Sequence, residues 1–494
     1  MINFLGLDIG TSGVKAVILD EHDKERASAS AALAVDRPRP LWSEQDPEAW
    51  WRATEAVFDR LAREQPALMS DIAAIGLSGQ MLGVTLLDAT DRPLRPALIW
   101  NDGRAVQECA LLLEKVPGFV DIAGCRPMAG FCAPKILWLA RHEPDAIAKT
   151  RRILLAKDYV RLRLCGEAIS DLADSSATLL MDTRAGTWSE AAIMACGISR
   201  DVLPRLVESG AEAGTLRSEL SRRWNMQPGV IVAGGAGDNM CGAVGADVVN
   251  RGDAYISLGT SGVYFVANDQ FVPAHGQGMH THRHAVSGLF AQHGCVLSAA
   301  GALSWLAGLL SIESIERFLS DIEAADIESE QIPIFTPYLS GERTPHDNPC
   351  ATAAFSNLSL AVGPLHLGRA VLEGVAFAIA DCHDALLGVG TPIDDIALIG
   401  GGARSRFWGE IIASTIGRPL RIPPLAALGP AVGAARLARK AKGGCLVAAA
   451  ADSGARIVPR ADLAEGLRER RARYREHYPL LSREKPVPSA SVHL

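Results

Sequence analysis

A seven-residue pattern that occurs twice constrains the fold of this chain more than any other feature. Residues 7–13 read LDIGTSG and residues 256–262 read ISLGTSG, and each copy lies at the end of a short apolar run. An apolar run of this length predicts a buried strand, and the glycines that follow it permit a tight hairpin turn. Two copies of the same strand and turn predict a duplicated α/β fold with two related domains.

The first copy has the composition of a phosphate-binding turn. Asp8 stands where the strand is expected to stop, and Gly10, Thr11, Ser12 and Gly13 follow it. Backbone N–H groups and two hydroxyls in such a turn can face phosphate oxygens, while the carboxylate is available for Mg²⁺. The pattern is neither a P-loop nor a dinucleotide-binding fingerprint. An ordinary glycine-containing hairpin is the structural alternative.

The second copy and a later glycine run suggest the rest of a nucleotide site. Gly259, Thr260 and Ser261 repeat the turn, but Ser257 replaces the carboxylate, which suits two domains that bind one nucleotide from opposite sides. The run IGGGARS (399–405) follows an apolar strand. Its backbone at Gly401, Gly402 and Ala403 can approach a flat adenine or a ribose, because little side chain intervenes.

Polar and aromatic residues follow two other expected strands, and strand ends are where α/β folds place their sites. Residues 72–78 lead to Gln80, Met81 and Leu82, and the run ALIW (97–100) ends at Trp100 and leads to Asn101 and Asp102. A ring face combined with amide and carboxylate groups suits a polyol. For residues 100–104, a helix cap with Arg104 in a salt bridge is the alternative interpretation.

Asp238 is the strongest catalytic candidate. It follows an apolar strand and a glycine run in VIVAGGAGDN (230–239), where small residues leave space around its carboxylate. A carboxylate placed beside a substrate hydroxyl can accept its proton while a phosphoryl group is transferred. A helix-capping aspartate before residues 241–248 is the weaker alternative.

Taken together, these motifs resemble the FGGY family of carbohydrate kinases, and most closely its xylulokinases. The matching segments occur in family order: DIGTSGVK (8–15), LWSEQDPEAWW (41–51), GQM (79–81), WNDGR (100–104), APKILW (133–138), GAGDN (235–239), LGTSGVYF (258–265), YLSGERTPH (338–346), AVLEG (370–374) and IGGGARS (399–405). The resemblance implies an α/β, two-domain actin and hexokinase-like (ribonuclease H-like) ATPase fold with a catalytic cleft between the domains.

The resemblance also implies a reaction and its cofactors, ATP and Mg²⁺. An FGGY kinase transfers the γ-phosphate of ATP to a sugar. The xylulokinases, which this chain resembles most closely, convert D-xylulose to D-xylulose 5-phosphate. The resemblance assigns Asp238 the role of general base, and we expect Asp8 and Asp238 to bind the metal ion. One position departs from the family pattern, since Leu82 stands where a histidine is usual. Related kinases of D-ribulose, L-xylulose, a tetrulose or a polyol therefore remain alternatives, as does an actin-like or Hsp70-like ATPase without sugar kinase activity.

The same resemblance predicts the domain limits. Residues 1–245 would form the N-terminal domain, with the sugar site, the first phosphate turn and the catalytic aspartate. Residues 246–482 would form the C-terminal domain, with the second phosphate turn and the adenosine site. Residues 483–494 are rich in proline and serine and are expected to be a flexible tail.

Composition excludes several other classes of protein. A net charge of −7 over 494 residues argues against a nucleic-acid partner, because such proteins usually carry a basic face. No apolar run approaches the length of a membrane span. The ten cysteines contain no C-x-x-C pair and are expected to be reduced. We expect a cytoplasmic protein without a membrane partner, and a homodimer remains open.

The sequence also makes five local predictions. A helix should begin at Asp46-Pro47, with its tryptophans in the core. His280, His282 and His284 should share one face of a strand, more consistent with a polar strand than with zinc. Asn357, where the family has glycine, should adopt a left-handed backbone. Lys135 is expected at a helix start or in a surface salt bridge, and residues 467–478 as a solvated helix.

Overall fold

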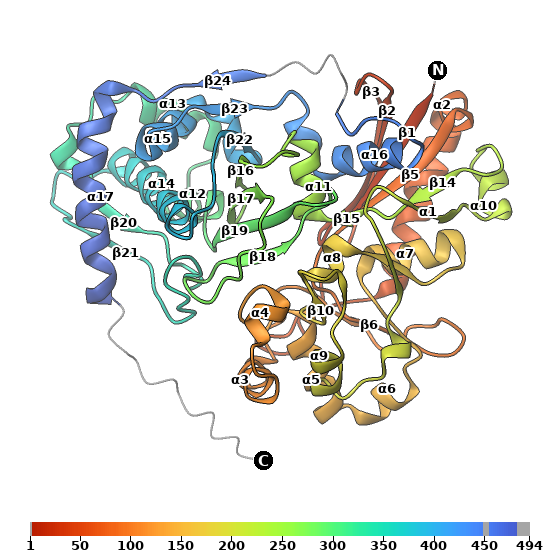
Figure 1. Ribbon diagram of the computed structural model, residues 1–494. Coiled ribbons are helices and arrows are strands. Elements are labelled where there is room, and N and C mark those ends of the chain that lie inside the picture. Colours follow the sequence, from red (N-terminus) through yellow and green to blue (C-terminus); the bar gives the residue numbers. More distant parts are fainter. Residues whose placement is uncertain (1, 448–453, 482–494) are drawn as a thin grey trace.

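The computed structural model describes residues 2–447 and 454–481, so the predicted flexible tail at 483–494 lies outside the described residues. Within the described residues, two seven-stranded mixed sheets dominate the fold. The sheets lie in separate lobes, with two helices between them (Figure 1). This arrangement agrees with the predicted α/β duplication.

The first sheet has the strand order β13-β14-β5-β1-β2-β3, with the short β15 beside β5. Its strands are β1 (Asn3–Ile9), β2 (Gly13–Asp20), β3 (Glu25–Ala32), β5 (Ile72–Gly79), β13 (Glu212–Thr215), β14 (Ile231–Ala233) and β15 (Ala236–Gly237). β1 pairs antiparallel with β2 and parallel with β5. The turn after β1 and the end of β5 therefore meet at one edge of the sheet.

The second sheet has the order β18-β19-β17-β16-β22-β23-β24. Its strands are β16 (Asp253–Leu258), β17 (Gly262–Asn268), β18 (His280–Arg283), β19 (Phe290–Val296), β22 (Asp395–Ile399), β23 (Leu420–Ile422) and β24 (Ala455–Ile457). β16 pairs antiparallel with β17 and parallel with β22. The unit β16-β17-β22 therefore repeats the arrangement of β1-β2-β5, and each unit carries one copy of the repeated sequence.

Helices α11 (Asp238–Gly245) and α16 (Pro430–Ala441) cross between the lobes. Glycine permits this contact, because a methyl group on Gly433 would lie 1.8 Å from the carbonyl oxygen of Cys241. α16 also lies directly on the first sheet, where a methyl group on Gly76 would meet the Ala434 oxygen at 1.8 Å. α11 packs toward the second sheet, against Tyr255. Each of the two crossing helices therefore lies against the sheet of the other half of the chain.

The remaining elements cover these sheets or form peripheral layers. The helices of eight residues or more are α1 (Pro47–Glu64), α3 (Val106–Lys115), α5 (Cys132–His142), α7 (Ala156–Cys165), α12 (Ala300–Leu309), α13 (Ile315–Ala324), α14 (Pro364–Gly388), α15 (Arg406–Ile416) and α17 (Ala461–Leu481). The shorter helices are α2 (Pro66–Ser70), α4 (Phe119–Ala123), α6 (Pro144–Lys149), α8 (Leu172–Ser176), α9 (Glu190–Ala195) and α10 (Ser218–Arg223). The minor strands are β4 (Glu44–Gln45), β6 (Thr85–Leu87), β7 (Ala97–Leu98), β8 (Arg152–Leu154), β9 (Ile169–Asp171), β10 (Met181–Asp182), β11 (Thr187–Trp188), β12 (Arg205–Val207), β20 (Ile334–Thr336) and β21 (Ala354–Ser356).

Several local predictions are confirmed. Asp46 caps α1 by accepting a hydrogen bond from the Glu48 N–H, and Pro47 is the first helical residue. Trp50 and Trp51 of that helix are buried. Asn357 has a φ of 62°, so asparagine does adopt the left-handed backbone that glycine would supply. All ten cysteines are free.

Residues 467–478 form the predicted helix, but only its outer face is solvated, where Glu469 and Arg473 are exposed. The segment belongs to α17, which packs on α14 through buried groups: Arg470 donates to Glu373 at 2.6 Å, and Tyr474 is 1% exposed. Arg471 also forms an ion pair with Asp381 at 2.9 Å. The many charges in this segment suggested a helix surrounded by solvent, but Arg470 and Arg471 form ion pairs across the contact with α14.

Candidate active site

The first repeated turn begins with a carboxylate in a poorly solvated place. Asp8 lies near the end of β1, and one of its oxygens accepts a hydrogen bond from the Ser78 hydroxyl of β5 at 2.8 Å. Burial raises the pKa of Asp8 to about 6, although the Ser78 hydrogen bond and the charge of Lys15 act in the other direction. Asp8 is thus a carboxylate that gains stability when a positive charge comes near.

Asp238 is the first residue of α11, directly after β15. One carboxylate oxygen accepts the N–H of Asn239 at 2.8 Å. Burial and, as the second cause, the negative charge of Asp8 together raise the pKa of Asp238 to about 7. The two carboxylates therefore interact electrostatically although they lie far apart in the sequence. The helix-capping alternative does not hold, because Gly237 occupies the cap position.

A cavity of about 420 Å³ opens beside Asp238. Groups from both halves of the chain line it: Met81, Leu82, Trp100, Asn101, Phe131, Asp238, Asn239, Ser261, Gly262, Val263, His280, His282, His293, Cys295, Leu297, Ser340 and Arg343. Met81, Leu82, Trp100 and Asn101 were predicted at the sugar site. The histidines and Cys295 were not, because their positions depend on the pairing of β18, β19 and β17. Arg343 belongs to the motif YLSGERTPH, but no role was assigned to it from the sequence.

A second, smaller cavity of about 190 Å³ lies on the other side of Asp238. Its lining includes Ser257 and Gly400, together with Gly429 at the start of α16. Asp238 and Asn239 line both cavities. Asp238 therefore stands where the larger and the smaller cavity meet.

The predicted adenosine turn is only partly at this smaller cavity. Gly400 lines it, whereas Gly402 is packed beneath Leu258, where a methyl group would lie 2.8 Å from the leucine Cβ. Gly401 is exposed, and Ala403 is half-buried. The Ser405 side chain caps α15 by accepting a hydrogen bond from the Trp408 N–H, so the helix begins directly after this turn.

The first turn is hydrogen-bonded to the sugar-site candidates. The Thr11 hydroxyl donates to Gln80 Oε1 at 3.2 Å and accepts from Trp100 Nε1 at 2.9 Å. Gln45 joins the same network, because it donates to the Thr11 carbonyl at 2.7 Å and accepts from Gln80 at 2.6 Å. Gln80 is 1% exposed, so it supports the site from behind. Trp100 reaches the cavity with its indole ring anchored.

Leu82 lies in a turn that Lys135 holds in place. The backbone of Leu82 has a φ of 68°, which is unusual for a branched apolar residue. Lys135 donates to the Leu82 carbonyl at 2.6 Å and to the Ile99 carbonyl at 2.9 Å. Its side chain is buried in α5, and burial lowers its pKa to about 8. The helix-start position was correct, but the expected surface location was not.

Asp102 is held by protein groups and does not line the larger cavity. Its carboxylate accepts the Ser43 N–H at 2.7 Å and forms a buried ion pair with Arg104 at 2.7 Å. Arg104 in turn bonds Glu44 at 2.7 Å. This geometry favours the structural alternative for Asp102, whereas Asn101 and Trp100 line the cavity.

The second repeated turn is anchored to a helix instead. The Gly259 carbonyl accepts the Ala300 N–H at 2.8 Å, and the Thr260 carbonyl accepts the Gly301 N–H at 3.1 Å. These donors belong to the first residues of α12. The side chain of Thr260 is exposed, and Ser261 lines the larger cavity. The turn is thus fixed through its carbonyl groups, with its hydroxyls uncommitted among the described contacts.

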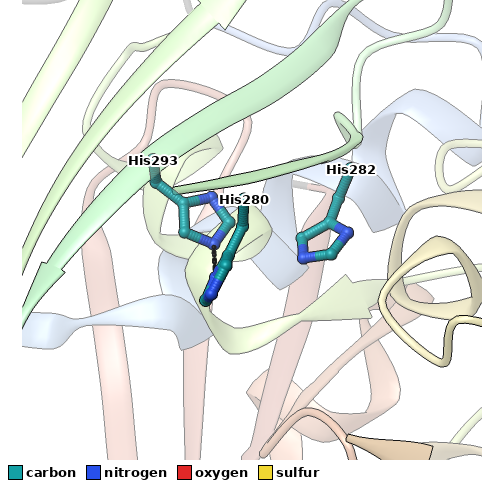
Figure 2. A group of neighbouring side chains, drawn as sticks. All are labelled: His280, His282 and His293. Atoms are coloured by element: carbon teal, nitrogen blue, oxygen red, sulfur yellow. Dashed lines mark hydrogen bonds between the residues drawn. The ribbon is translucent and has the colours of Figure 1, made fainter. Parts of the chain in front are cut away.

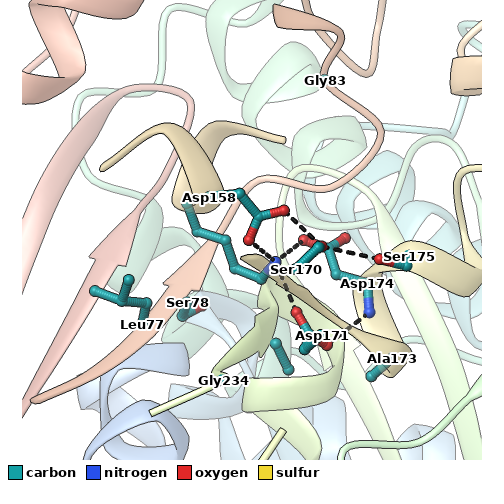
Figure 3. A network of polar contacts seen from close by, with 12 residues as sticks. Leu77, Ser78, Gly83, Asp158, Ser170, Asp171, Ala173, Asp174, Ser175 and Gly234 are labelled. Carbon is teal, nitrogen blue, oxygen red and sulfur yellow. Dashed lines mark hydrogen bonds and ion pairs between the residues drawn. The ribbon is translucent and has the colours of Figure 1, made fainter. Parts of the chain in front are cut away.

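A buried charged network lies near the end of β5, at Leu77 and Ser78, and near Gly234 (Figure 3). Lys157 of α7 forms ion pairs with Asp158 at 2.8 Å, Asp171 at 2.7 Å and Asp174 at 3.0 Å. Burial raises the pKa of Asp174 to about 8. Arg161 pairs with Asp158 at 2.8 Å and also bonds the Gly234 carbonyl, just before β15. No motif marked these residues, because they are spread over two helices and a short strand.

Comparison with known proteins identifies the family. Residues 3–245 match the FGGY family of carbohydrate kinases, N-terminal domain, and residues 254–441 match its C-terminal domain. The chain belongs to the FGGY family of carbohydrate kinases. Its two-domain α/β fold is the fold of that family's solved structures, as predicted.

Several relatives with a similar sequence are xylulose kinases. A xylulose kinase of Escherichia coli is 44% identical over 88% of this chain and 89% of its own length. The crystal structure described as "a xyloylose kinase from Brucella ovis" is 41% identical, with a TM-score of 0.92 over 97% of this chain and 99% of that one. A xylulose kinase structure from Rhodospirillum rubrum is 29% identical with a TM-score of 0.88 over 97% and 99%.

Membership implies ATP and a sugar as substrates, and kinases of this family typically use a divalent metal. Among the described helices, none combines the length and the apolar content needed to cross a bilayer.

Proposed function

We propose that this protein transfers the γ-phosphate of ATP to the terminal hydroxyl of D-xylulose and forms D-xylulose 5-phosphate. One observation carries the proposal: Asp238 lines both the larger and the smaller cavity. A base at the junction between a sugar cavity and a nucleotide cavity is what in-line phosphoryl transfer requires. The xylulose kinases among the relatives support D-xylulose as the sugar.

In this mechanism, Asp238 accepts the proton of the sugar's terminal hydroxyl. The hydroxyl oxygen attacks the γ-phosphorus, the bond from that phosphorus to the bridging oxygen breaks, and ADP leaves with the electron pair. A pKa of about 7 keeps a substantial fraction of Asp238 ionised at neutral pH while it remains a competent base. Its position at the start of α11 fixes the carboxylate relative to both cavities.

Asp8 and Asp238 suit a Mg²⁺ ion. Their mutual repulsion raises the pKa of Asp238, and a divalent cation between or beside them would relieve that repulsion. When bound with ATP, Mg²⁺ neutralises charge on the β- and γ-phosphate oxygens. Asp8 is the main ligand in this proposal, because Asp238 also serves as base.

The turns divide the nucleotide between them. Thr11, Ser12 and Gly13 provide backbone N–H groups for the phosphates from one lobe, and Gly259, Thr260 and Ser261 do so from the other. Gly10 closes the first turn, because its N–H is bonded to the Gly13 carbonyl at 3.0 Å. The backbone from Gly400 to Ala403 contacts adenosine, with Gly401 and Gly402 in the turn. On the sugar side, Met81, Leu82, Trp100 and Asn101 contact the substrate, and Gln80 orients Trp100 through Thr11.

The domain limits remain part of the proposal. Residues 1–245 act as the sugar-binding domain and residues 246–482 as the nucleotide-binding domain, so that closure around the crossing helices excludes water from the junction. The homodimer and the cytoplasmic location remain predictions from the sequence.

The test is ADP release from the purified protein with ATP and Mg²⁺ across ketopentoses, tetruloses, pentitols and glycerol. D-xylulose should give the highest kcat/KM, and Asp238→Ala should abolish the sugar-dependent rate, whereas the exposed control Asp145→Asn should retain it. If another sugar leads and Leu82→His shifts preference toward D-xylulose, the substrate assignment is wrong and the kinase reaction stands. Sugar-independent turnover that Asp238→Ala leaves unchanged would instead favour an actin-like or Hsp70-like ATPase.

A further inference from the structure

Three imidazoles gather in the wall of the larger cavity (Figure 2). His280 and His282 lie on β18, and His293 lies on β19. The antiparallel register of these strands places His280 opposite His293. One ring nitrogen of each histidine lies within 4.8 Å of those of the other two. Strand pairing, rather than spacing in the sequence, therefore creates the cluster.

The cluster differs from the predicted set of histidines. His284 follows β18 directly. Its Nδ1 accepts the Val286 N–H at 2.9 Å, and none of its nitrogens belongs to the group of three. His293 takes its place from the neighbouring strand. The sequence favours a polar strand over zinc, because no further ligand, such as a carboxylate or a cysteine, stands at ligand spacing along the chain. The structure supplies that ligand from β19.

Packing alone does not explain these side chains. Each of the three is at most 3% exposed. His280 Nδ1 and His293 Nε2 are hydrogen-bonded at 3.2 Å, but His280 Nε2, His282 Nδ1 and His293 Nδ1 have no partner among the described residues. A buried polar group without a partner costs about 1–3 kcal/mol. Apolar side chains would fill this wall at lower cost, so these histidines are not there for packing alone. The unpartnered nitrogens of His280 and His293 are not the two that face each other, so the site itself rests on the grouped nitrogens of the three rings.

The surroundings hold the rings neutral and in fixed orientations. Burial is the main cause that lowers the pKa of all three. Burial and the Arg343 guanidinium together lower the pKa of His293 to about 3, and the neighbouring His293 is the second cause for His280 and His282. Phe131 packs edge-on against His280, with ring centroids 5.3 Å apart. Neutral imidazole is the form that binds metal ions. Arg343 opposes a cation, whereas the Asp238 carboxyl in the same cavity favours one.

We propose that His280, His282 and His293 bind one divalent transition-metal ion of the zinc class. Zinc–nitrogen bonds of about 2.0–2.1 Å place tetrahedral ligand nitrogens about 3.4 Å apart. The His280–His293 separation of 3.2 Å is close to that value, and His282 completes the site by a small movement of its ring. Three protein ligands leave a fourth coordination position open. Mg²⁺ prefers oxygen ligands, so this site is separate from Asp8.

The location of the site has a consequence for the reaction. The three histidines share the larger cavity with Met81 and Asp238, so an ion with bound water there occupies space that the sugar would use. Zn²⁺ should therefore inhibit phosphorylation competitively with the sugar. This consequence depends on the proposed function, whereas metal binding itself does not.

Metal binding is tested on the full chain without nucleotide, because ATP chelates zinc. Equilibrium dialysis against Zn²⁺ should show a site of one equivalent that His282→Asn loses. His284→Asn is the matched control, since it alters an equally buried histidine beside the same strand and an asparagine oxygen can still accept the Val286 N–H. Co²⁺ in the site should give the visible absorption of a tetrahedral centre with nitrogen ligands.

Three results would overturn the site. They are the lack of a stoichiometric Zn²⁺ site in the wild-type protein, an unchanged site in a folded His282→Asn variant, and a thiolate-to-cobalt charge-transfer band that Cys295→Ser removes. If His282→Asn does not fold, as circular dichroism would show, the Co²⁺ spectrum of the wild-type protein still decides between imidazole and thiolate ligands. Zinc inhibition that persists in His282→Asn would overturn the competitive effect alone, even where metal binding is confirmed.

Discussion

The two copies of the repeated sequence form hairpins that differ in register by one residue. In the first copy, Ile9 pairs with Val14, so residues 10–13 form the turn. In the second copy, Leu258 pairs with Gly262, and only residues 259–261 lie between the strands. The turn sequence GTSG is the same in both. The local sequence therefore permits both registers, and contacts elsewhere must decide between them.

Those contacts differ in kind. The first turn is bonded through the Thr11 side chain to Gln80 and Trp100. The second is bonded through main-chain carbonyls, including that of Thr260, to the first N–H groups of α12. The first turn is thus hydrogen-bonded to residues of the proposed sugar site and follows a carboxylate, whereas the second is fixed to a helix. Both turns serve the nucleotide in the proposed function, and Ser261 of the second turn also lines the larger cavity.

The largest expected effect comes from giving the first hairpin the residue of the second. Asp8→Ser removes the carboxylate that we assign to the metal, and kcat should fall by about 10²-fold or more, as losses of direct electrostatic stabilisation do. Steady-state kinetics with saturating ATP and D-xylulose measure it. Adding Ser257→Asp should not restore the rate, because that carboxylate would stand on the wrong lobe. Rescue by the double substitution would show that the two hairpins are interchangeable.

A smaller effect separates the two threonines. Thr11→Val removes the hydroxyl between Gln80 and Trp100, and the loss of about 1 kcal/mol should raise the sugar KM about fivefold. Thr260→Val should leave the sugar KM unchanged, since the Thr260 side chain is exposed and valine keeps the carbonyl that anchors the turn. It should raise the KM for ATP, because we assign this turn to the phosphates. KM values for both substrates in both variants make the comparison. Equal changes in sugar KM would contradict a link confined to the first turn.

Residues carried by contiguous motifs could be placed from the sequence, whereas those defined by tertiary contacts could not. Asp8 lies at the end of an apolar strand and before a glycine-containing turn, whereas Asp238 follows an apolar strand and a glycine run, and strand ends converge in such folds. Asp102 was assigned to the sugar site because the sequence alone does not decide between that role and a salt bridge with Arg104. His293 joins His280 only through the register of β18 and β19. The Lys157 network likewise depends on how α7 and α8 pack, which no spacing reveals.

The smallest expected effect is on stability, and it concerns the carboxylate that the second hairpin lacks. The pKa of Asp8 rises from 3.8 to about 6 on folding, so between these values the folded state binds more protons than the unfolded state. The contribution of Asp8 is therefore most favourable below pH 3.8 and is lost as the pH rises through about 6. At pH 8 the charged, poorly solvated carboxylate is a net cost that Asp8→Asn removes.

Asp8→Asn should accordingly raise the thermal midpoint at pH 8 by about 1–2 °C, a small shift because the chain is large. The gain should shrink as the pH falls toward 4, where the wild-type carboxyl is increasingly protonated. Ser257→Ala, at the matching position of the second hairpin, provides a control with no titrating group, so its midpoint difference should not vary with pH. Differential scanning calorimetry of both variants between pH 4 and pH 8 measures this. A gain that is constant with pH, or largest in acid, would mean that burial does not raise the pKa of Asp8, and the electrostatic contrast between the hairpins would then be wrong.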